Sequence, residues 1–354
     1  MKKFIDKIYR YLSNDIGIDL GTANTLVNVR GKGIVINEPS VVAINQKTGQ
    51  VVAVGHDAEK MIGRTPGHIE AVRPLVDGVI SDFEATEEML AHFIRKAALV
   101  APGKLLGPRV VIGVPSGITN VEKRAVRDAA RNAGAREVHL IEEPMAAAIG
   151  TRLPVADPVG SMVVDIGGGT TDIAVISLGG IVTSRNLKIA GDKLGEDIRS
   201  YIRDEFQILI GEKTAEQIKI AIGSAGTRSQ ALEMGVRGRD LVSGLPREIT
   251  VSDTDICEAT AESIAKIVEA VKEVLEITPP EVVADVMNRG IVLVGGGALI
   301  SGIDELLELE LKVPVYIAED PLSCVARGTG FVLEDLDFHQ DVLISNEDEL
   351  PPTN

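Results

Sequence analysis

The sequence has few cysteines and histidines and no long apolar run. Its two cysteines, Cys257 and Cys324, stand far apart without Cys or His neighbours at ligand spacing, which argues against a zinc site and a disulfide framework. Two lone cysteines fit a reducing cytoplasm. The five histidines are scattered, so none is expected to be a catalytic base. No run of roughly 18 apolar residues occurs, so no membrane-spanning helix is expected.

Basic and aromatic residues are also scarce. There are 36 Lys and Arg against 52 Asp and Glu, a formal net charge of −16. So acidic a chain is not expected to bind nucleic acid, because phosphate contacts require basic side chains. Trp is absent and aromatic residues make up 3% of the chain, so Val, Ile, Leu and Ala must fill the core. With 354 residues, 45% of them hydrophobic, two domains are expected.

Strand-like and helix-like segments alternate along the chain, which predicts an α/β fold. The less regular stretch 224–250 is predicted to be a loop or small hairpin. The predicted strands include 109–115, 137–144 and 290–297, and the predicted amphipathic helices are 84–100, 121–134, 197–211 and 252–277.

The two ends of the chain differ from the rest. Residues 1–14 have the pattern of a short basic amphipathic helix, which can lie in the interface of an anionic membrane. Docking of this helix on the protein's own core is the alternative. Residues 336–354 form an acidic tail that is expected to be mobile. The apolar positions of the first segment are Phe4, Ile5, Ile8, Tyr9 and Leu12, and the basic ones are Lys2, Lys3, Lys7 and Arg10.

Two segments share one plan of strand, aspartate, glycine turn and strand. They read IGIDLGTANTLVNV (16–29) and MVVDIGGGTTDIAVI (162–176), and Asp19 and Asp165 stand 146 positions apart (165 − 19). The match predicts an internal repeat with two similar halves. A strand follows each glycine turn, where a dinucleotide-binding fold would place a helix. Each turn is therefore predicted to be a hairpin whose N–H groups bind phosphate.

The aspartate before each turn suggests a metal ion. Asp19 and Asp165 end equivalent strands of the two halves. Two carboxylates beside phosphates suit Mg²⁺, which keeps several of its waters and binds through few acids. Capping of the turn is the alternative role for either aspartate.

These segments, with LIEEPMAAAIG (140–150) and VGGGA (294–298), resemble the motifs of the actin/Hsp70/sugar-kinase superfamily. They are most similar to the MreB family of bacterial actin homologues, over about residues 15–335. The resemblance implies an actin-like ATPase fold, with two duplicated ribonuclease-H-like lobes around a nucleotide cleft. The implied lobes are residues 15–155, with a small subdomain at about 35–105, and residues 156–335, with a small subdomain at about 190–255.

The resemblance also implies which residues bind ATP or ADP with Mg²⁺. Asp19 and Asp165 would hold the metal ion through water. Actin has a lysine after its first loop where this chain has the apolar run 25–27, so metal and backbone must neutralise more of the phosphate charge. The first phosphate loop would be Gly21, Thr22, Ala23 and Asn24; the second, Gly167, Gly168, Gly169 and Thr170; the adenosine loop, Gly295, Gly296, Gly297 and Ala298; and the ribose and adenine contacts, Glu216 and Lys219.

Structural alternatives exist for two of these sets. A plain strand-to-helix turn would also explain the glycines at 295–297. Glu216 and Lys219 have the spacing of an exposed ion pair on a helix.

Hydrolysis requires a positioned water molecule, and Glu143 is the candidate residue. Pro144 suits the first position of a helix, so Glu143 is predicted to end a strand with its carboxylate in the cleft. An ordinary N-cap acid is the alternative. Glu142 is the rival, but the actin family places its water-orienting side chain at the position of Glu143.

The resemblance implies a slow ATPase that polymerises and organises cell-wall synthesis to set rod cell shape. Its partners would be itself, membrane proteins of cell-wall elongation, and the anionic inner face of the cell membrane. Residues 1–14 and the loop residues Leu105 and Leu106 would contact the lipid, unless the two leucines pack on the core.

Three other functions compete with this interpretation. An Hsp70-type chaperone is disfavoured because 57 residues follow Gly297 (354 − 297), too few for a substrate domain. A sugar or acetate kinase is disfavoured because residues 114–117 offer no catalytic aspartate. A filament that binds ATP and barely hydrolyses it stays open.

Overall fold

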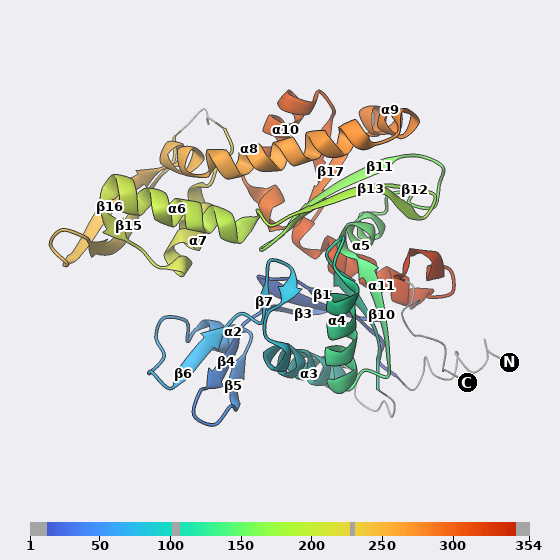
Figure 1. Ribbon diagram of the computed structural model, residues 1–354, viewed down its shortest axis with the longest axis horizontal. Coiled ribbons are helices and arrows are strands. Elements are labelled where there is room, and N and C mark those ends of the chain that lie inside the picture. The colour runs from blue at the N-terminus through green and yellow to red at the C-terminus, as the bar shows by residue number, and fades with distance from the viewer. Residues whose placement is uncertain (1–12, 101–106, 227–230, 345–354) are drawn as a thin grey trace.

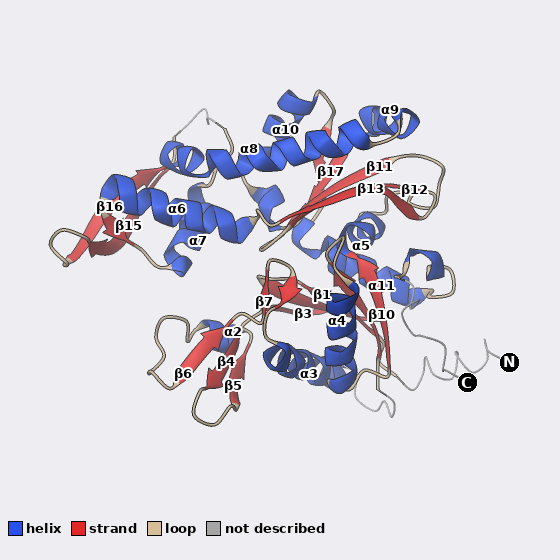
Figure 2. Cartoon of the chain, viewed as in Figure 1, coloured by secondary structure: helices blue, strands red, loops and turns tan. Residues whose placement is uncertain are grey.

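The computed structural model describes residues 13–100, 107–226 and 231–344. These residues form two lobes that lie one above the other in Figure 1, and each lobe combines sheets with flanking helices (Figure 2). Across the described ranges, no helix is both long and apolar enough to cross a bilayer. Of the predicted membrane elements, residues 1–12 of the segment 1–14 and the Leu105–Leu106 pair lie outside the described residues.

The first lobe contains a five-stranded sheet in the order β10-β9-β1-β2-β3. Strands β1, β2 and β3 form an antiparallel meander. Strand β9 pairs parallel with β1, and β10 pairs parallel with β9. The central strands are almost wholly buried, as expected for strands that are covered on both faces. The strands are β1 (Ile16–Leu20), β2 (Asn24–Val29), β3 (Gly33–Pro39), β9 (Arg109–Val114) and β10 (Glu137–Glu142).

The second lobe repeats this plan in the order β13-β12-β11-β17-β18. Asp19 pairs with Leu26 across β1 and β2, and Asp165 pairs with Asp172 across β11 and β12. The offset of 146 residues therefore holds on both strands of the hairpin (165 − 19 and 172 − 26), and the predicted repeat is present. The strands are β11 (Ser161–Ile166), β12 (Thr171–Ser177), β13 (Gly180–Leu187), β17 (Ile291–Val294) and β18 (Val315–Ile317).

Each lobe also carries a small three-stranded sheet, which follows the meander in the chain. The sheet of the first lobe has the order β5-β4-β6, and that of the second lobe has the order β14-β15-β16. The hairpin predicted near residues 224–250 is the antiparallel pair β15 and β16. The elements are β4 (Val42–Asn45), β5 (Val51–Val54), α2 (His56–Glu59), β6 (Ile69–Val72), the pair β7 (Leu75–Val76) and β8 (Val79–Ile80), α6 (Gly191–Phe206), β14 (Ile208–Leu209), α7 (Glu212–Ile222), β15 (Glu233–Asp240) and β16 (Pro246–Ser252).

Amphipathic helices cover the outer faces of the large sheets. In the first lobe, Phe93 of α3 and Ala129 of α4 are buried in the same core cluster as residues of β1 and β9. In the second lobe, Ile267 and Val271 of α8 are buried with residues of β11 and β17. Their apolar stripes therefore face the sheets, as predicted from the spacing. The helices are α3 (Phe83–Val100), α4 (Asn120–Asn132), α8 (Asp253–Ile277), α9 (Pro280–Arg289) and α10 (Ile303–Leu311).

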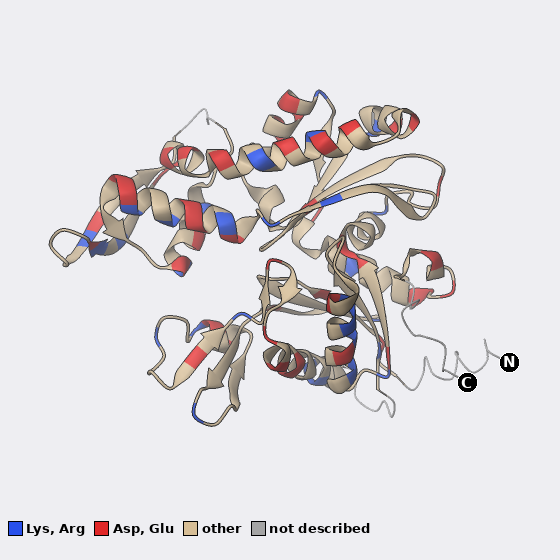
Figure 3. Cartoon of the chain, viewed as in Figure 1, with Lys and Arg blue, Asp and Glu red and all other residues tan. Residues whose placement is uncertain are grey.

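The polar faces and caps of these helices match their surroundings. Thr119 caps α4 by accepting the N–H of Glu122 while the Glu122 carboxylate accepts the N–H of Thr119, and Ser252 and Asp255 cap α8 in the same way. Figure 3 shows acidic residues spread over α6 and α8, whereas Lys and Arg predominate on α4. The negative charge is therefore unevenly distributed.

Two helices join the lobes. Helices α5 (Glu143–Gly150) and α11 (Cys324–Glu334) are buried together with Val111 of the first sheet and Val163 of the second. Their backbones approach closely, because a Cβ on Gly328 would overlap the carbonyl oxygen of Ala146. Although α11 follows the second lobe in the chain, a Cβ on Gly17 of β1 would overlap its Thr329. The first lobe is therefore completed by the C-terminal helix.

Candidate nucleotide site

The β1–β2 turn and the β11–β12 turn meet between the lobes. We name Gly21–Asn24 the first glycine turn and Gly167–Thr170 the second. A Cβ built on Gly168 would stand 2.6 Å from the Cβ of Ala23, and one on Gly169 would stand 2.7 Å from Oγ1 of Thr22. Real Cβ atoms essentially never come so close, so glycine alone fits at both positions. The two predicted phosphate loops thus lie side by side on opposite lobes.

Four carboxyl groups cluster beside these turns. Burial raises the pKa of Asp19 to about 7. Burial, with the charges of Asp19 and Asp172, raises the pKa of Asp165 well above its usual range. The pKa of Glu143 is raised in the same way by burial and by the three aspartates. No basic side chain of the described residues contributes to these three shifts, so the cluster has an excess of negative charge.

Asp172 is the member of this cluster that the sequence reasoning missed. Its Oδ1 accepts the backbone N–H of Ser116 at 2.7 Å, and its Oδ2 accepts a hydrogen bond from Asn186 at 2.8 Å. Burial raises the pKa of Asp172 to about 6, and these hydrogen bonds oppose that shift. Because Ser116 belongs to the first lobe, the bond links the lobes. The sequence did contain a signal for Asp172, because it is the one acid within an otherwise apolar predicted strand, and a buried acid needs partners.

Glu143 and Glu142 face different surroundings. Strand β10 ends at Glu142 and Glu143 is the first residue of α5, so the prediction that Glu143 ends the strand was off by one residue. Burial raises the pKa of Glu142, while the backbone of Gly117 and the charge of Lys123 lower it, all within the first lobe. Glu143 instead faces the aspartate cluster. Its Cγ would stand 3.4 Å from a Cβ on Gly113 of β9, so the Glu143 side chain passes close to the end of that strand.

The first turn of α6 supports the second glycine turn. The N–H of Gly191 donates to the carbonyl oxygen of Gly167 at 3.1 Å, and the N–H of Asp192 donates to that of Gly168 at 2.8 Å. These donors lie at a helix N-terminus and have no partners within the helix. They hold two carbonyl groups of the glycine turn toward α6.

Lys219 of α7 reaches the same place. Its Nζ donates to the carbonyl oxygen of Gly191 at 2.8 Å and pairs with Glu216 at 2.7 Å. The helix pair predicted from the spacing is therefore present, but the Lys219 side chain is only 13% exposed. Both residues thus lie beside the element that supports the second glycine turn.

The glycines after β17 complete one side of the site. Gly296, Gly297 and Ala298 begin a 3₁₀ helix, η1 (Gly296–Leu299), and Gly295 has a φ of +80° that favours glycine. A Cβ on Gly295 would overlap the carboxylate of Asp165. The predicted adenosine loop therefore packs against the end of β11, next to the carboxylate cluster.

The β7–β8 hairpin contacts both glycine turns. The N–H of Gly78 donates to Oγ1 of Thr22 at 3.2 Å. A Cβ on Gly78 would stand 2.9 Å from Cγ2 of Thr170, and one on Gly169 would stand 3.1 Å from the nitrogen of Asp77. The β7–β8 hairpin of the first lobe therefore lies against both turns where they meet, and we call it the cover of this junction.

The carboxylates at the site fit a cation that binds through its own water molecules better than one that the side chains coordinate directly. Within the parts of the chain that the structure describes, no three His, Cys, Asp or Glu side chains are arranged to chelate a metal ion. Asp19 nevertheless lies close enough to Asp165 to raise its pKa. A buried cluster of this charge fits Mg²⁺ that keeps most of its waters.

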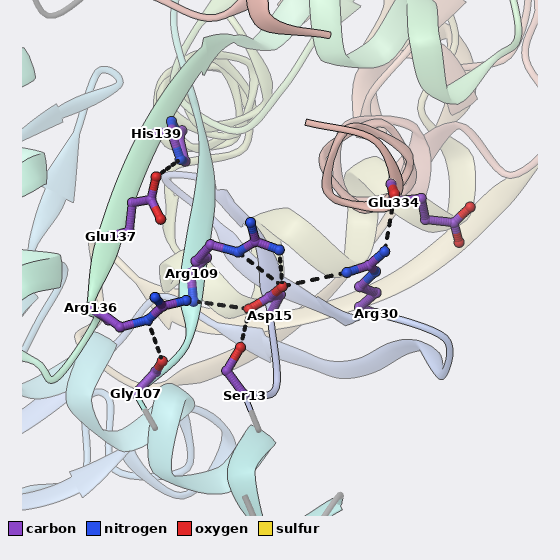
Figure 4. Close-up of polar contacts among 9 residues, drawn as sticks. All are labelled: Ser13, Asp15, Arg30, Gly107, Arg109, Arg136, Glu137, His139 and Glu334. Carbon is purple, nitrogen blue, oxygen red and sulfur yellow. Dashed lines mark hydrogen bonds and ion pairs between the residues drawn. The ribbon is translucent and has the colours of Figure 1, made fainter. Parts of the chain in front are cut away.

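A second polar cluster lies at the edge of the first lobe (Figure 4). Nη2 of Arg109 donates to the buried Asp15 at 2.6 Å, and the Ser13 hydroxyl donates to it at 2.6 Å. Burial raises the pKa of Asp15, but these hydrogen bonds and the charge of Arg109 outweigh burial and leave the pKa below its usual value. Arg136 donates to the carbonyl oxygen of Gly107 at 3.4 Å. Ser13 and Gly107 thus lie in one polar region.

Two lobes with one sheet plan, joined by two helices and meeting at paired hairpin turns, define an actin-like ATPase fold. The family model of the MreB/Mbl protein matches residues 13–341. The cell shape-determining protein Mbl of Bacillus subtilis (strain 168) is 56% identical over 325 residues, which cover 92% of this chain and 97% of the relative. The cell shape-determining protein MreB of Escherichia coli (strain K12) is 54% identical over 350 residues, covering 97% and 100%. The chain therefore belongs to the MreB/Mbl family.

Solved structures agree with this assignment. MreB5 of Spiroplasma citri bound to ADP has a TM-score of 0.87 and 42% identity, covering 93% of this chain and 98% of the other, and the same protein bound to AMPPNP gives the same values. The MamK double helical filament has a TM-score of 0.79 and 25% identity, covering 91% and 99%. The predicted family and fold are confirmed, while the individual site residues and domain boundaries stay predictions.

Proposed function

We propose that this chain is an actin-like filament protein that binds ATP or ADP with Mg²⁺ between its lobes and hydrolyses ATP slowly. It organises cell-wall synthesis at the inner face of the cell membrane and so sets rod cell shape. The contact between the two glycine turns carries the proposal, because it brings backbone donors from both lobes beside one carboxylate cluster. Relatives described as cell shape-determining, and a neighbour bound to ADP or AMPPNP, support it.

In this proposal the glycine turns bind the phosphates. In this role their backbone N–H groups donate to phosphate oxygens, and glycine lets these oxygens approach the backbone. The side chains of Thr22, Asn24 and Thr170 add donors. Bound Mg²⁺ supplies the positive charge that the phosphates and the carboxylate cluster lack. Asp19 and Asp165 hold it through water.

Glu143 orients the water that attacks the terminal phosphate. Its carboxylate faces Asp19 and Asp165, whereas that of Glu142 faces the first lobe. Phosphoryl transfer depends mostly on positioning and charge stabilisation, so one carboxylate that accepts a hydrogen bond from water is sufficient. Rapid turnover is not required of a filament protein, which fits a slow ATPase.

The adenosine moiety is bound beside the second lobe. Gly295–Ala298 lie against the end of β11, and Glu216 and Lys219 lie beside the start of α6. These two regions flank the second glycine turn. A nucleotide whose phosphates lie at the junction of the turns can therefore reach both with its sugar and base.

The family supports filament formation, whereas no single residue of this chain does. Neighbours include a protein solved as a double helical filament. ATP binding closes the lobes and favours contacts between copies of the chain, and hydrolysis weakens them. Membrane proteins of cell-wall elongation are the expected partners of the filament.

The polar region around Asp15 supports a membrane-facing edge. Ser13 lies near the end of the predicted amphipathic segment 1–14, and Gly107 directly follows Leu105 and Leu106 in the predicted loop. Both residues form hydrogen bonds in the polar region shown in Figure 4, Ser13 with Asp15 and Gly107 with Arg136. Two weak anchors that start from one region can bind one lipid surface together, and a filament repeats them many times.

Light scattering tests the filament proposal most directly. Adding Mg-ATP to the purified chain, without sugar or peptide, should raise the scattering, and EDTA should prevent the rise. ATP binding without assembly under any condition would favour an Hsp70-like or sugar-kinase-like ATPase. Deletion of residues 2–12 should reduce co-sedimentation with anionic liposomes, and unchanged pelleting would contradict the membrane anchor.

A further inference from the structure

Arg73 forms an ion pair that crosses from the first lobe to the second. It lies between β6 and β7, and its Nη1 is 3.1 Å from Oδ1 of Asp192 at the start of α6. Its Nη2 is 3.8 Å from Oε2 of Glu212, whose other oxygen is 3.8 Å from Arg199. The side chains of Arg73 and Asp192 are each 38% exposed. The guanidinium group therefore has acidic partners on two helices of the other lobe.

Each partner of this pair is directly connected to the glycine turns. On the first-lobe side, Arg73 lies two residues before β7. Its carbonyl oxygen accepts a hydrogen bond from the hydroxyl of Ser81 at 3.3 Å, which joins the two ends of the β7–β8 hairpin. The tip of that hairpin contacts Thr22. On the second-lobe side, the N–H of Asp192 holds the carbonyl of Gly168. The pair therefore joins the cover to the support of the turn that it covers.

The exposure of this pair distinguishes it from the buried contact between the lobes. Asp172 and Ser116 are both nearly fully buried, so their hydrogen bond is costly to break. The Arg73–Asp192 pair stays in contact with water, and exposed ion pairs are weak and sensitive to salt. Of these two links between the lobes, the exposed pair is therefore the easier one to open.

We propose that Arg73 is a positioning residue for nucleotide retention, which acts through Asp192 and Glu212 to hold the β7–β8 hairpin over the second glycine turn. Opening of the pair lets the hairpin move away from the turn and precedes nucleotide release. This inference rests on the proposed nucleotide site, since it assigns a gate to that site. It concerns release and affinity and leaves the hydrolysis step to Glu143.

The release rate of a fluorescent ADP analogue, measured by stopped flow with Mg²⁺ present, tests the proposal. Arg73→Gln should speed release about 3–5-fold, the upper end of the effect of losing one exposed ion pair, because Arg73 has two acidic partners. Arg73→Lys should be intermediate, because lysine keeps the charge but not the two-pronged geometry. Raising the salt concentration should speed release from the parent chain and change Arg73→Gln little. The matched control is Arg237→Gln, which removes a pair with Glu248 inside one small sheet.

Exchange of the charges gives the sharper test. Arg73→Asp and Asp192→Arg should each speed release, and the double variant should return it toward the parent rate. No recovery, or release from Arg73→Gln equal to that from Arg237→Gln, would overturn the proposal.

A distance measurement separates failure of the gate from failure of the nucleotide site. Spin labels on Lys60→Cys and Arg203→Cys, in a Cys257→Ser background, report the separation of the lobes without nucleotide. Arg73→Gln should broaden this distance distribution, while Arg237→Gln should not. If the parent chain binds no nucleotide, the proposed function fails and the distance alone decides whether Arg73 holds the lobes. An unchanged distribution would refute that role.

Discussion

Gly168 packs against Ala23, and Gly169 packs against Thr22. The internal repeat relates these two contacts to each other. Subtracting the offset of 146 relates Gly168 to Thr22 and Gly169 to Ala23 (168 − 146 and 169 − 146). The contact of Gly168 with Ala23 is therefore the repeat-related copy of the contact of Gly169 with Thr22. Side chains occupy the first turn and glycines the second, since side chains in both would overlap at the junction.

Gly168→Ala should separate the two glycine turns. The added methyl group would stand 2.6 Å from the Cβ of Ala23, so the turns must move apart. Overpacking of this kind costs about 1–3 kcal/mol, and if this cost falls on the nucleotide-bound state it corresponds to about a 5- to 150-fold loss of ATP affinity. Calorimetric titration with Mg-ATP checks this. Gly180→Ala is the control, because its nearest neighbour is 3.9 Å away; equal affinities of the two variants would contradict the proposed site.

Glu143→Gln should spare ATP binding and reduce phosphate release by about 10²–10⁴-fold, the range for loss of a positioned acid–base group. Glu142→Gln should behave like the parent chain, because its carboxylate interacts with Gly117 and Lys123 instead of the aspartate cluster. Phosphate release is measured with both variants saturated with Mg-ATP. A normal rate for Glu143→Gln and a loss for Glu142→Gln would exchange their roles.

Asp15→Asn should destabilise the protein at neutral pH by about 1.5–3 kcal/mol, the range for hydrogen bonds to charged groups. The pKa of Asp15 in the folded chain lies below 3.8, so its contribution is complete above that value and disappears as the pH falls through the lower, folded pKa. Urea unfolding of parent and variant should therefore converge in acid. Asp204→Asn, at an exposed pair with Arg203, is the control and should match the parent throughout.

Gly328→Ala should lower the free energy of unfolding by about 1–3 kcal/mol or more, through overpacking against the backbone of α5. Gly195→Ala on α6 is the matched control, since nothing lies within 4 Å of a Cβ there and alanine favours a helix by about 1 kcal/mol. The two substitutions should thus change the urea midpoint in opposite directions. Two stabilised variants would show that α5 and α11 can separate without cost.

The sequence alone predicted what depends on local pattern. The hairpin at Gly167–Thr170 followed from strand residues on both sides of the glycines, and α8 followed from its spacing and its Ser252 cap. The repeat followed from Asp19 and Asp165 because each aspartate occurs in the same local pattern.

What the sequence did not predict depends on contacts between distant segments. The N–H of Ser116 that bonds to Asp172 is 56 positions away, and the partner of Arg73 is 119 positions away. Neither pair leaves a periodic signal. Helix α6 was predicted to begin near residue 197 but begins at Gly191, since its first turn is fixed by bonds to the second glycine turn rather than by apolar spacing.

The return of α11 to the first lobe affects the order in which the chain can mature on the ribosome. Domains usually fold as they emerge, the N-terminal one first. Here Gly17 of β1 packs against Thr329, which is synthesised some 300 residues later (329 − 17 = 312). The face of the first sheet that packs with α11, which includes Val111, is therefore uncovered while the first lobe leaves the ribosome. We expect newly made copies to become resistant to protease only once α11 is complete.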